Sequence, residues 1–193
     1  MKKIILASGS PRRKELMGGL DIPFTIDTGN SFEESPIEFS DPAEVPLAMA
    51  RGKSRGFHRP LQDDELLITA DTVVVLRSSD GASVIGKPHN REEAVQMLRK
   101  LSGNVHEVIT AVVLRDKERE ESFTDSTLVY FAELSSSEIE YYIDKYRPYD
   151  KAGSYGVQEW IGYVGIERIE GSFYNVMGYP VHRVYKEIVK FVD

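Results

Sequence analysis

The stretch that decides the fold is IILASGSPRRK, residues 4–14. Its apolar start is typical of a buried strand. The small residues at positions 8–10 then break the strand, Ser10 is suited to cap a helix, and Pro11 is suited to open it. Such a strand, loop and helix bring backbone N–H groups and the positive end of the helix dipole to one point. The stretch therefore predicts a β-loop-α unit that can hold an anion.

Three cations, Arg12, Arg13 and Lys14, follow Pro11 in the first helical turn. The helix dipole disfavours positive charge at this end by roughly 0.3–1 kcal/mol for each side chain, and a bound anion would offset that cost. A phosphate cradle is one interpretation of this turn. An ordinary strand-to-helix connection with a solvated basic face is the other.

The composition is ordinary for a soluble globular protein. The chain has 193 residues, 41% of them hydrophobic and 28% charged, and we expect one domain over residues 1–193. A net charge of −7 argues against a general nucleic-acid or anionic-membrane surface. No cysteine is present, which excludes disulfides, thiolate metal sites and cysteine nucleophiles. The first apolar run is too short for a signal peptide, and no run has the ~20 residues of a membrane span, so we expect a cytoplasmic protein.

A second apolar run, residues 66–76, is interrupted by one polar pair, Asp71-Thr72. A run this apolar belongs inside a sheet. An ionised carboxylate there costs several kcal/mol unless it is paired or bound to metal. We therefore favour a functional role for Asp71 at a break in a central strand. The alternative is a carboxylate that accepts backbone N–H groups in a tight turn.

The rest of the chain alternates between strand and helix patterns. Further strands are expected at residues 24–27, 84–85, 105–114, 122–131 and 162–169, and helices at 42–57, after Asn90, after Ser135 and from Pro180. The two long strands are joined by a short charged turn, so they form an antiparallel pair beside parallel ones. The sequence thus predicts an α/β fold with a mixed twisted sheet flanked by helices.

Phosphoryl chemistry needs cations around the phosphates, a carboxylate or two for Mg²⁺, and a group that orients water. No Walker A sequence and no G-x-G-x-x-G are present, which weakens kinase, GTPase and Rossmann interpretations. The cations and hydroxyl that could meet phosphates are Ser8, Arg12, Arg13, Lys53 and Lys87. The carboxylates are Asp71 and either Glu33 or Glu34.

Five motifs together resemble the Maf family of nucleoside triphosphate pyrophosphatases. They are SGSPRR (8–13), ADT (70–72), GKP (86–88), LSG (101–103) and DKAGSYGVQ (150–158), in order and at compatible spacing over nearly the whole chain. The resemblance implies a Maf/ITPase-like architecture with two lobes around a central cleft. It also implies a divalent cation, Mg²⁺ or Mn²⁺, and cleavage of a nucleoside triphosphate to the monophosphate and pyrophosphate.

The resemblance assigns roles by position. Asp71 matches the family's catalytic proton acceptor, and a role as metal ligand is equally open. Arg12, Thr72 and Gln158 match three positions that separate the subclasses, and this combination is similar to the subclass that acts on dTTP and UTP. The implied substrate is therefore a regular or a modified pyrimidine nucleotide.

The remaining matches belong to the polar lining of the family's site. Ser8, Arg13, Lys53 and Lys87 match that lining, and Glu34 matches an acidic residue in it that would share the metal with Asp71. Glu33 is adjacent and is the alternative. Ser154 stands where alanine is common in the family.

Two other functions are alternatives to a pyrophosphatase. One is a nucleotidyltransferase, which needs a second substrate pocket for which 193 residues leave little room. The other is a nucleotide-binding regulator of cell division and septum formation. Release of pyrophosphate from UTP or dTTP without a sugar phosphate separates the three. We expect a nucleoside triphosphate as the partner, with no nucleic acid and no membrane, and a homodimer is compatible with this.

Overall fold

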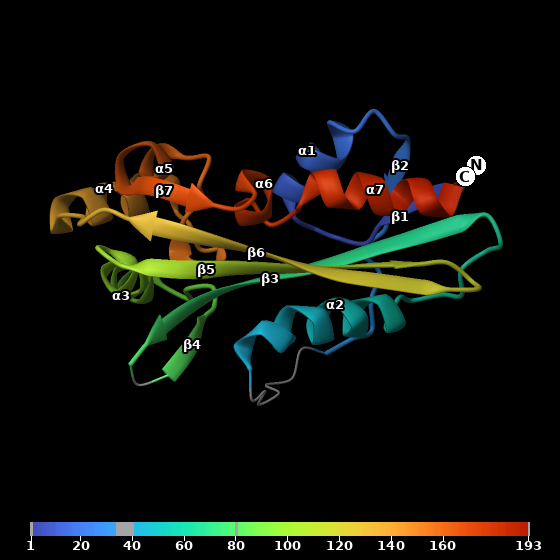
Figure 1. Cartoon of the computed structure of the whole chain (residues 1–193), viewed down its shortest axis with the longest axis horizontal. Helices are drawn as coiled ribbons and strands as arrows, with labels where there is room; N and C mark the ends of the chain where they lie inside the picture. The colour runs from blue at the N-terminus through green and yellow to red at the C-terminus, as the bar shows by residue number, and fades with distance from the viewer. Residues whose placement is uncertain (1, 34–40, 80, 193) are drawn as a thin grey trace. The chain divides into compact units, whose positions relative to one another are not determined.

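The computed structural model describes residues 2–33, 41–79 and 81–192 (Figure 1). Its strands are β1 (Lys3–Leu6), β2 (Phe24–Ile26), β3 (Glu65–Ser78), β4 (Gly81–Ile85), β5 (Val105–Arg115), β6 (Glu120–Phe131) and β7 (Ile166–Glu170). Its helices are α1 (Pro11–Gly18), α2 (Val45–Arg55), α3 (Arg91–Leu101), α4 (Ser136–Tyr146), α5 (Trp160–Gly165), α6 (Phe173–Val176) and α7 (Val181–Val192), with 3₁₀ turns η1 (Pro42–Glu44) and η2 (Ala152–Ser154).

The described strands form one mixed, seven-stranded sheet in the order β2-β1-β3-β5-β6-β7, with β4 paired to β3. Strand β1 runs parallel to both β2 and β3. The pairs β3–β4 and β6–β7 are antiparallel. The predicted α/β class, the mixed sheet and the central position of the strand that carries Asp71 are confirmed.

The chain divides into two compact units. Unit 1 comprises Met1–Asp71, Thr110–Asp125 and Gly178–Asp193, and unit 2 comprises Thr72–Ile109 and Ser126–Met177. Strands β3, β5 and β6 contribute residues to both units. Two lobes around a central cleft, and a single domain over residues 1–193, stay predictions. In the part of the chain that the structure describes, no helix has the length and apolarity that a membrane crossing needs.

In unit 1, alternate residues of β1 and β3 face opposite sides of the sheet. The odd-numbered Ile5 and Leu67 pack with Phe57 and Leu61. The even-numbered residues pack against α1 and α7, in a cluster that includes Ile4, Leu6, Leu66, Ile68, Met17, Val184 and Ile188. Figure 1 shows α2 and α7 on opposite sides of this part of the sheet. Odd-numbered positions later in this half of β3 therefore face the α2 side.

Helix α2 begins later than the sequence predicted. Asp41 accepts the N–H of Ala43 at 3.0 Å, but the first turn is the 3₁₀ turn η1, and the α-helix spans Val45–Arg55 rather than residues 42–57. The reason is a second proline, Pro46, which has no N–H to donate to the carbonyl of Pro42. The segment from Asp41 to Arg55 still forms one capped helical unit.

Unit 2 contains β4, β7, η2 and helices α3 to α6. Helix α3 begins as expected after Asn90, whose side chain accepts the N–H of Glu93 at 2.9 Å. Helix α4 begins with a capping box between Ser135 and Glu138. These two helices pack against each other, and α3 also packs against η2.

The predicted strand at residues 162–169 is wrong in its first half, because α5 spans Trp160–Gly165 and β7 begins at Ile166. The N–H of Gly162 donates to the carbonyl of Glu159 at 2.9 Å, which forms a helical turn. A Cβ at Gly162 would lie 1.8 Å from the carbonyl oxygen of Val157. This contact between two stretches of backbone requires glycine, and the alternating pattern could not reveal it.

We expect Gly162→Ala to lower the free energy of unfolding by about 3 kcal/mol, because the added methyl forces backbone apart. Gly18→Ala is the matched control, since a Cβ at this helical glycine meets nothing within 4 Å. Chemical denaturation of both variants measures the difference. Equal stability of the two variants would contradict the close approach at Gly162.

Candidate active site

The loop between β1 and α1 is built as the sequence predicted. Ser10 caps α1, and its Oγ accepts the N–H of Arg13 at 3.5 Å, with Pro11 opening the helix. Ser8 is buried, and its Oγ accepts the N–H of Ser10 at 3.3 Å. The loop therefore holds its two hydroxyls in fixed positions at the N-terminus of α1.

The guanidinium of Arg13 ties this helix to its surroundings within unit 1. Its Nε donates to the carbonyl of Gly178 at 2.9 Å. Its Nη1 donates to the carbonyl of Ala70 at 2.9 Å and to Ser8 Oγ at 3.3 Å. Burial lowers the pKa of Arg13, and the negative charge of Asp71 opposes that shift. Arg13 is thus a structural anchor as well as a predicted phosphate ligand, and helical periodicity gave no sign of the first role.

Asp71 lies on the face of β3 that α2 covers. Two residues earlier, Thr69 Oγ1 donates to the carbonyl of Ala50 in α2 at 2.8 Å. Lys53, one helical turn beyond Ala50, brings its Nζ to 2.7 Å from Asp71 Oδ1. The exposed fractions of the two side chains are 25% for Lys53 and 18% for Asp71. Asp71 lies two residues after Thr69 in β3, and Lys53 lies one turn after Ala50 in α2. The contact between Thr69 and Ala50 therefore brings the carboxylate and the cation together.

This ion pair explains how a carboxylate is tolerated in an apolar strand. Strand β3 continues through Asp71 and Thr72 without a break, so the expected interruption is absent and the tight-turn alternative is wrong. Among the other cations of α2, Arg51 is engaged with Glu120 at 3.3 Å and Ser122 at 3.0 Å. Lys53 and Arg51 therefore point to different partners, as neighbouring positions of a helix require.

The oxygen ligands around Asp71 fit a divalent cation, although few of them come from the protein. Among residues 2–33, 41–79 and 81–192, no group of three or more His, Asp or Glu side chains gathers as a ready metal site. Glu34, the second predicted ligand, lies outside the described residues, whereas Glu33 is described and exposed. The ion pair with Lys53 uses Oδ1 of Asp71, which leaves Oδ2 as a hard oxygen ligand. Mg²⁺ needs only one or two carboxylates besides water and phosphate oxygens, so the residues fit such an ion.

The other predicted residues belong to unit 2. Thr72 follows Asp71 in β3, and Lys87 is exposed in the loop after β4. The N–H of Gly153 donates to the carbonyl of Gly86 at 3.0 Å. This bond places the loop that carries Lys87 beside the glycine-bearing loop that leads to Gln158.

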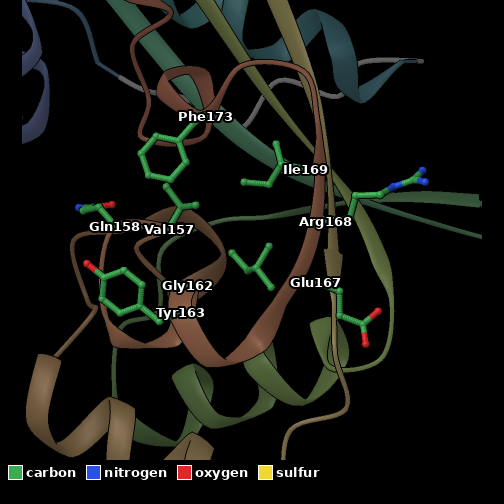
Figure 2. A pocket seen from close by; sticks show the side chains of 9 residues that line it. Val157, Gln158, Gly162, Tyr163, Glu167, Arg168, Ile169 and Phe173 are labelled. Atoms are coloured by element: carbon green, nitrogen blue, oxygen red, sulfur yellow. The ribbon is translucent and has the colours of Figure 1, made fainter.

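Gln158 lines a pocket of about 380 Å³ within unit 2 (Figure 2). Figure 2 shows Val157, Tyr163 and Phe173 gathered beside Gln158, and Ile169 of β7 lines the same pocket. The amide oxygen of Gln158, Oε1, is buried without a hydrogen-bond partner among the described residues. The pocket therefore combines apolar walls with an acceptor that a ligand N–H could satisfy.

Two aromatic walls of this pocket were missed by sequence reasoning. Tyr163 is 80% exposed and Phe173 is 41% exposed. Phe173 lies in α6, a short helix that no pattern in the sequence indicates. Exposed aromatic side chains beside a polar group are typical of binding sites, but no periodicity in the sequence marks them as exposed.

We expect Arg13→Ala to lower the free energy of unfolding by about 3 kcal/mol, because the carbonyls of Ala70 and Gly178 lose a charged donor. Lys14→Ala, at the exposed neighbouring position, is expected to change stability by no more than about 0.5 kcal/mol. Urea denaturation of both variants measures this. Equal midpoints would contradict the anchoring role and leave phosphate binding alone.

Comparison with known proteins agrees with these features. The family model described as Maf-like protein matches residues 3–191. A protein of Parabacteroides distasonis named dTTP/UTP pyrophosphatase is 52% identical over 189 residues, which cover 98% of this chain and 96% of that protein. Its namesake in Porphyromonas gingivalis is 53% identical over 191 residues, 98% of this chain and 94% of that protein. With the β1–α1 loop, the Asp71–Lys53 pair and matches of this extent, the chain belongs to the Maf family.

Proposed function

We propose that the protein hydrolyses dTTP and UTP to the monophosphate and pyrophosphate, as a nucleotide-pool house-cleaning enzyme. The observation that carries the proposal is the ion pair, at 2.7 Å, between Asp71 of the central strand β3 and Lys53 of α2. A charged pair at this place is costly to maintain for stability alone. The names of the similar proteins, dTTP/UTP pyrophosphatase, support the same activity.

In the proposed reaction, a water oxygen attacks the α-phosphorus and the bond from that phosphorus to the bridging oxygen breaks. Pyrophosphate leaves, and the proton of the attacking water passes to a carboxylate. Asp71 is the candidate acceptor, and the ion pair with Lys53 fixes its position. A role as metal ligand remains the other assignment for Asp71.

The phosphates would be bound by the cations and hydroxyl that the sequence predicted. Lys53 and Arg12 would supply positive charge from unit 1, and Ser8 would supply a buried hydroxyl beside the N-terminus of α1. Arg13, through its hydrogen bond to Ser8 Oγ, would hold that hydroxyl in place. Lys87, exposed in unit 2, is the remaining candidate.

A divalent cation, Mg²⁺ or Mn²⁺, would supply charge neutralisation on the triphosphate when bound. Asp71 would hold it, with Glu34 as the predicted second ligand. Cytoplasmic nucleotide pools would be the source of the substrate.

Base recognition is assigned to Gln158 and its pocket. Uracil and thymine present an N3–H donor beside the O4 acceptor, which matches one orientation of an amide, whereas cytosine presents the reverse pair. The buried Oε1 of Gln158 lacks a donor among the described residues, and N3–H is such a donor. Thr72 matches the same subclass pattern and is the proposed neighbour of the Gln158 amide. Both deoxyribose and ribose forms are expected as substrates.

Asp71→Asn is expected to lower kcat for UTP by a factor on the order of 10²–10⁴, as for loss of a general base. Asp63→Asn is the matched control, because Asp63 also pairs with a lysine, Lys117, but is 84% exposed. Pyrophosphate release with Mg²⁺ or Mn²⁺ present measures both variants below their melting temperatures. Wild-type turnover by Asp71→Asn would end this assignment.

Gln158→Ala is expected to reduce the preference for UTP over CTP, measured as the ratio of kcat/KM values, by about 10- to 100-fold, the effect of one unpaired buried polar group. The exposed Gln96 of α3 supplies the control variant Gln96→Ala. The measurement covers the eight common nucleoside triphosphates. A wild-type preference for purines, or an unchanged preference in Gln158→Ala, would contradict the proposed base site.

A further inference from the structure

Gln158 lies inside a short turn whose two ends are fixed. The N–H of Glu159 donates to the carbonyl of Gly156 at 3.0 Å, which closes the turn over residues 156–159. The carbonyl of Glu159 then accepts the N–H of Gly162 at 2.9 Å as α5 begins. The main chain is therefore hydrogen-bonded immediately before and after Gln158.

One buried hydroxyl holds both ends of this turn. Tyr142 of α4 is fully buried, with an exposed fraction of 0%. Its Oη accepts the N–H of Gly156 at 2.9 Å and donates to the carboxylate of Glu159. Burial and the carboxylate of Glu159 both raise the pKa of Tyr142, so the phenol keeps its proton and stays a donor. A single atom of α4 thus links the residues two before and one after Gln158.

A buried lysine completes the arrangement. Lys151, 8% exposed, places its Nζ 3.2 Å from Glu159 Oε1 and 2.8 Å from Asp150 Oδ1. The start of the glycine-bearing loop is therefore bound to the same carboxylate that Tyr142 holds. Gly156 belongs to this packing too, since a Cβ there would lie 2.8 Å from Cδ of Glu159.

This network has a consequence for specificity. A freely rotating amide can turn over and pair with cytosine as well as with uracil. Gln158 discriminates only if its amide is held both in one place and in one orientation, and the network supplies the first condition because it fixes the backbone on either side of Gln158.

We propose that Tyr142, acting through Glu159 and the N–H of Gly156, is a positioning residue that sets the base selectivity of Gln158. The inference rests on the proposed function. Neither Tyr142 nor Glu159 is assigned a contact with substrate. Substitution of either residue should therefore change the choice of nucleotide rather than the rate of the chemical step.

The test is Tyr142→Phe, which removes one oxygen atom and keeps the ring. We expect the ratio of kcat/KM for UTP to that for CTP to fall about tenfold or more, with kcat for UTP changed by less than threefold. Tyr146→Phe is the matched control, because Tyr146 lies one turn along the same helix and stacks on Tyr142, with the two ring centroids 5.1 Å apart. The control should keep the wild-type ratio.

A second readout does not depend on turnover. Trp160, the single tryptophan of the chain, directly follows Glu159. Its ring lies edge-on to that of Tyr141, with the two ring centroids 4.8 Å apart. Acrylamide quenching of its fluorescence should increase in Tyr142→Phe and stay unchanged in Tyr146→Phe. If Tyr142→Phe fails to fold, Glu159→Gln keeps an acceptor for the Tyr142 hydroxyl while removing the charge that Lys151 meets, and it should lower the same ratio.

The outcomes separate the two proposals. A wild-type enzyme without preference for UTP over CTP overturns the proposed base site, and the positioning role with it. A wild-type preference that Gln158→Ala abolishes but the Tyr142 and Glu159 variants retain overturns the positioning role alone. A lower melting temperature with an unchanged ratio also overturns it, because a purely structural residue would give that result.

Discussion

The ion pair between Asp71 and Lys53 is the constraint on which the rest of unit 1 depends. An ionised carboxylate in a central strand must be paired with a cation. Because side chains alternate along a strand, that cation must lie on the face of the sheet toward which the carboxylate points. That face is covered by α2, and the bond from Thr69 to the carbonyl of Ala50 fixes the helix against the strand. The opposite face is then left to the apolar cluster under α1 and α7.

Much of this arrangement could be predicted because it is encoded locally. The cap at Ser10, the proline at Pro11 and the apolar run around Asp71 each act over a few residues, and the structure confirms the elements that they predict. Asp71 was singled out for the same reason, since a carboxylate in a buried strand needs a partner. The resemblance assigns Lys53 to the lining of the site but not to Asp71 as a partner, because that pairing depends on how α2 packs against β3.

What sequence reasoning missed depends on contacts between residues far apart in the chain. The carbonyls that Arg13 binds belong to Ala70 and Gly178. Tyr142 is one of the buried residues of α4 with Ile139 and Ile143, yet its hydroxyl holds a turn that begins at Gly156. Gly162 is required by the carbonyl of Val157, and the resulting helix replaced the first half of a predicted strand. Backbone acceptors and backbone crowding leave no mark on a pattern of hydrophobic and polar residues.

The interleaving of the two units along the chain determines the order in which they can be completed during synthesis. Unit 2 has all its segments once Met177 has been made, whereas unit 1 still lacks Gly178–Asp193. Those last residues supply Val184 and Ile188, which belong to the same apolar cluster as Leu6 and Ile68 of the first segment. A nascent chain therefore carries the apolar face of β1 and β3 without this cover until residues 178–193 have been made. That interval is when the chain most needs protection from aggregation, and it closes only when α7 docks.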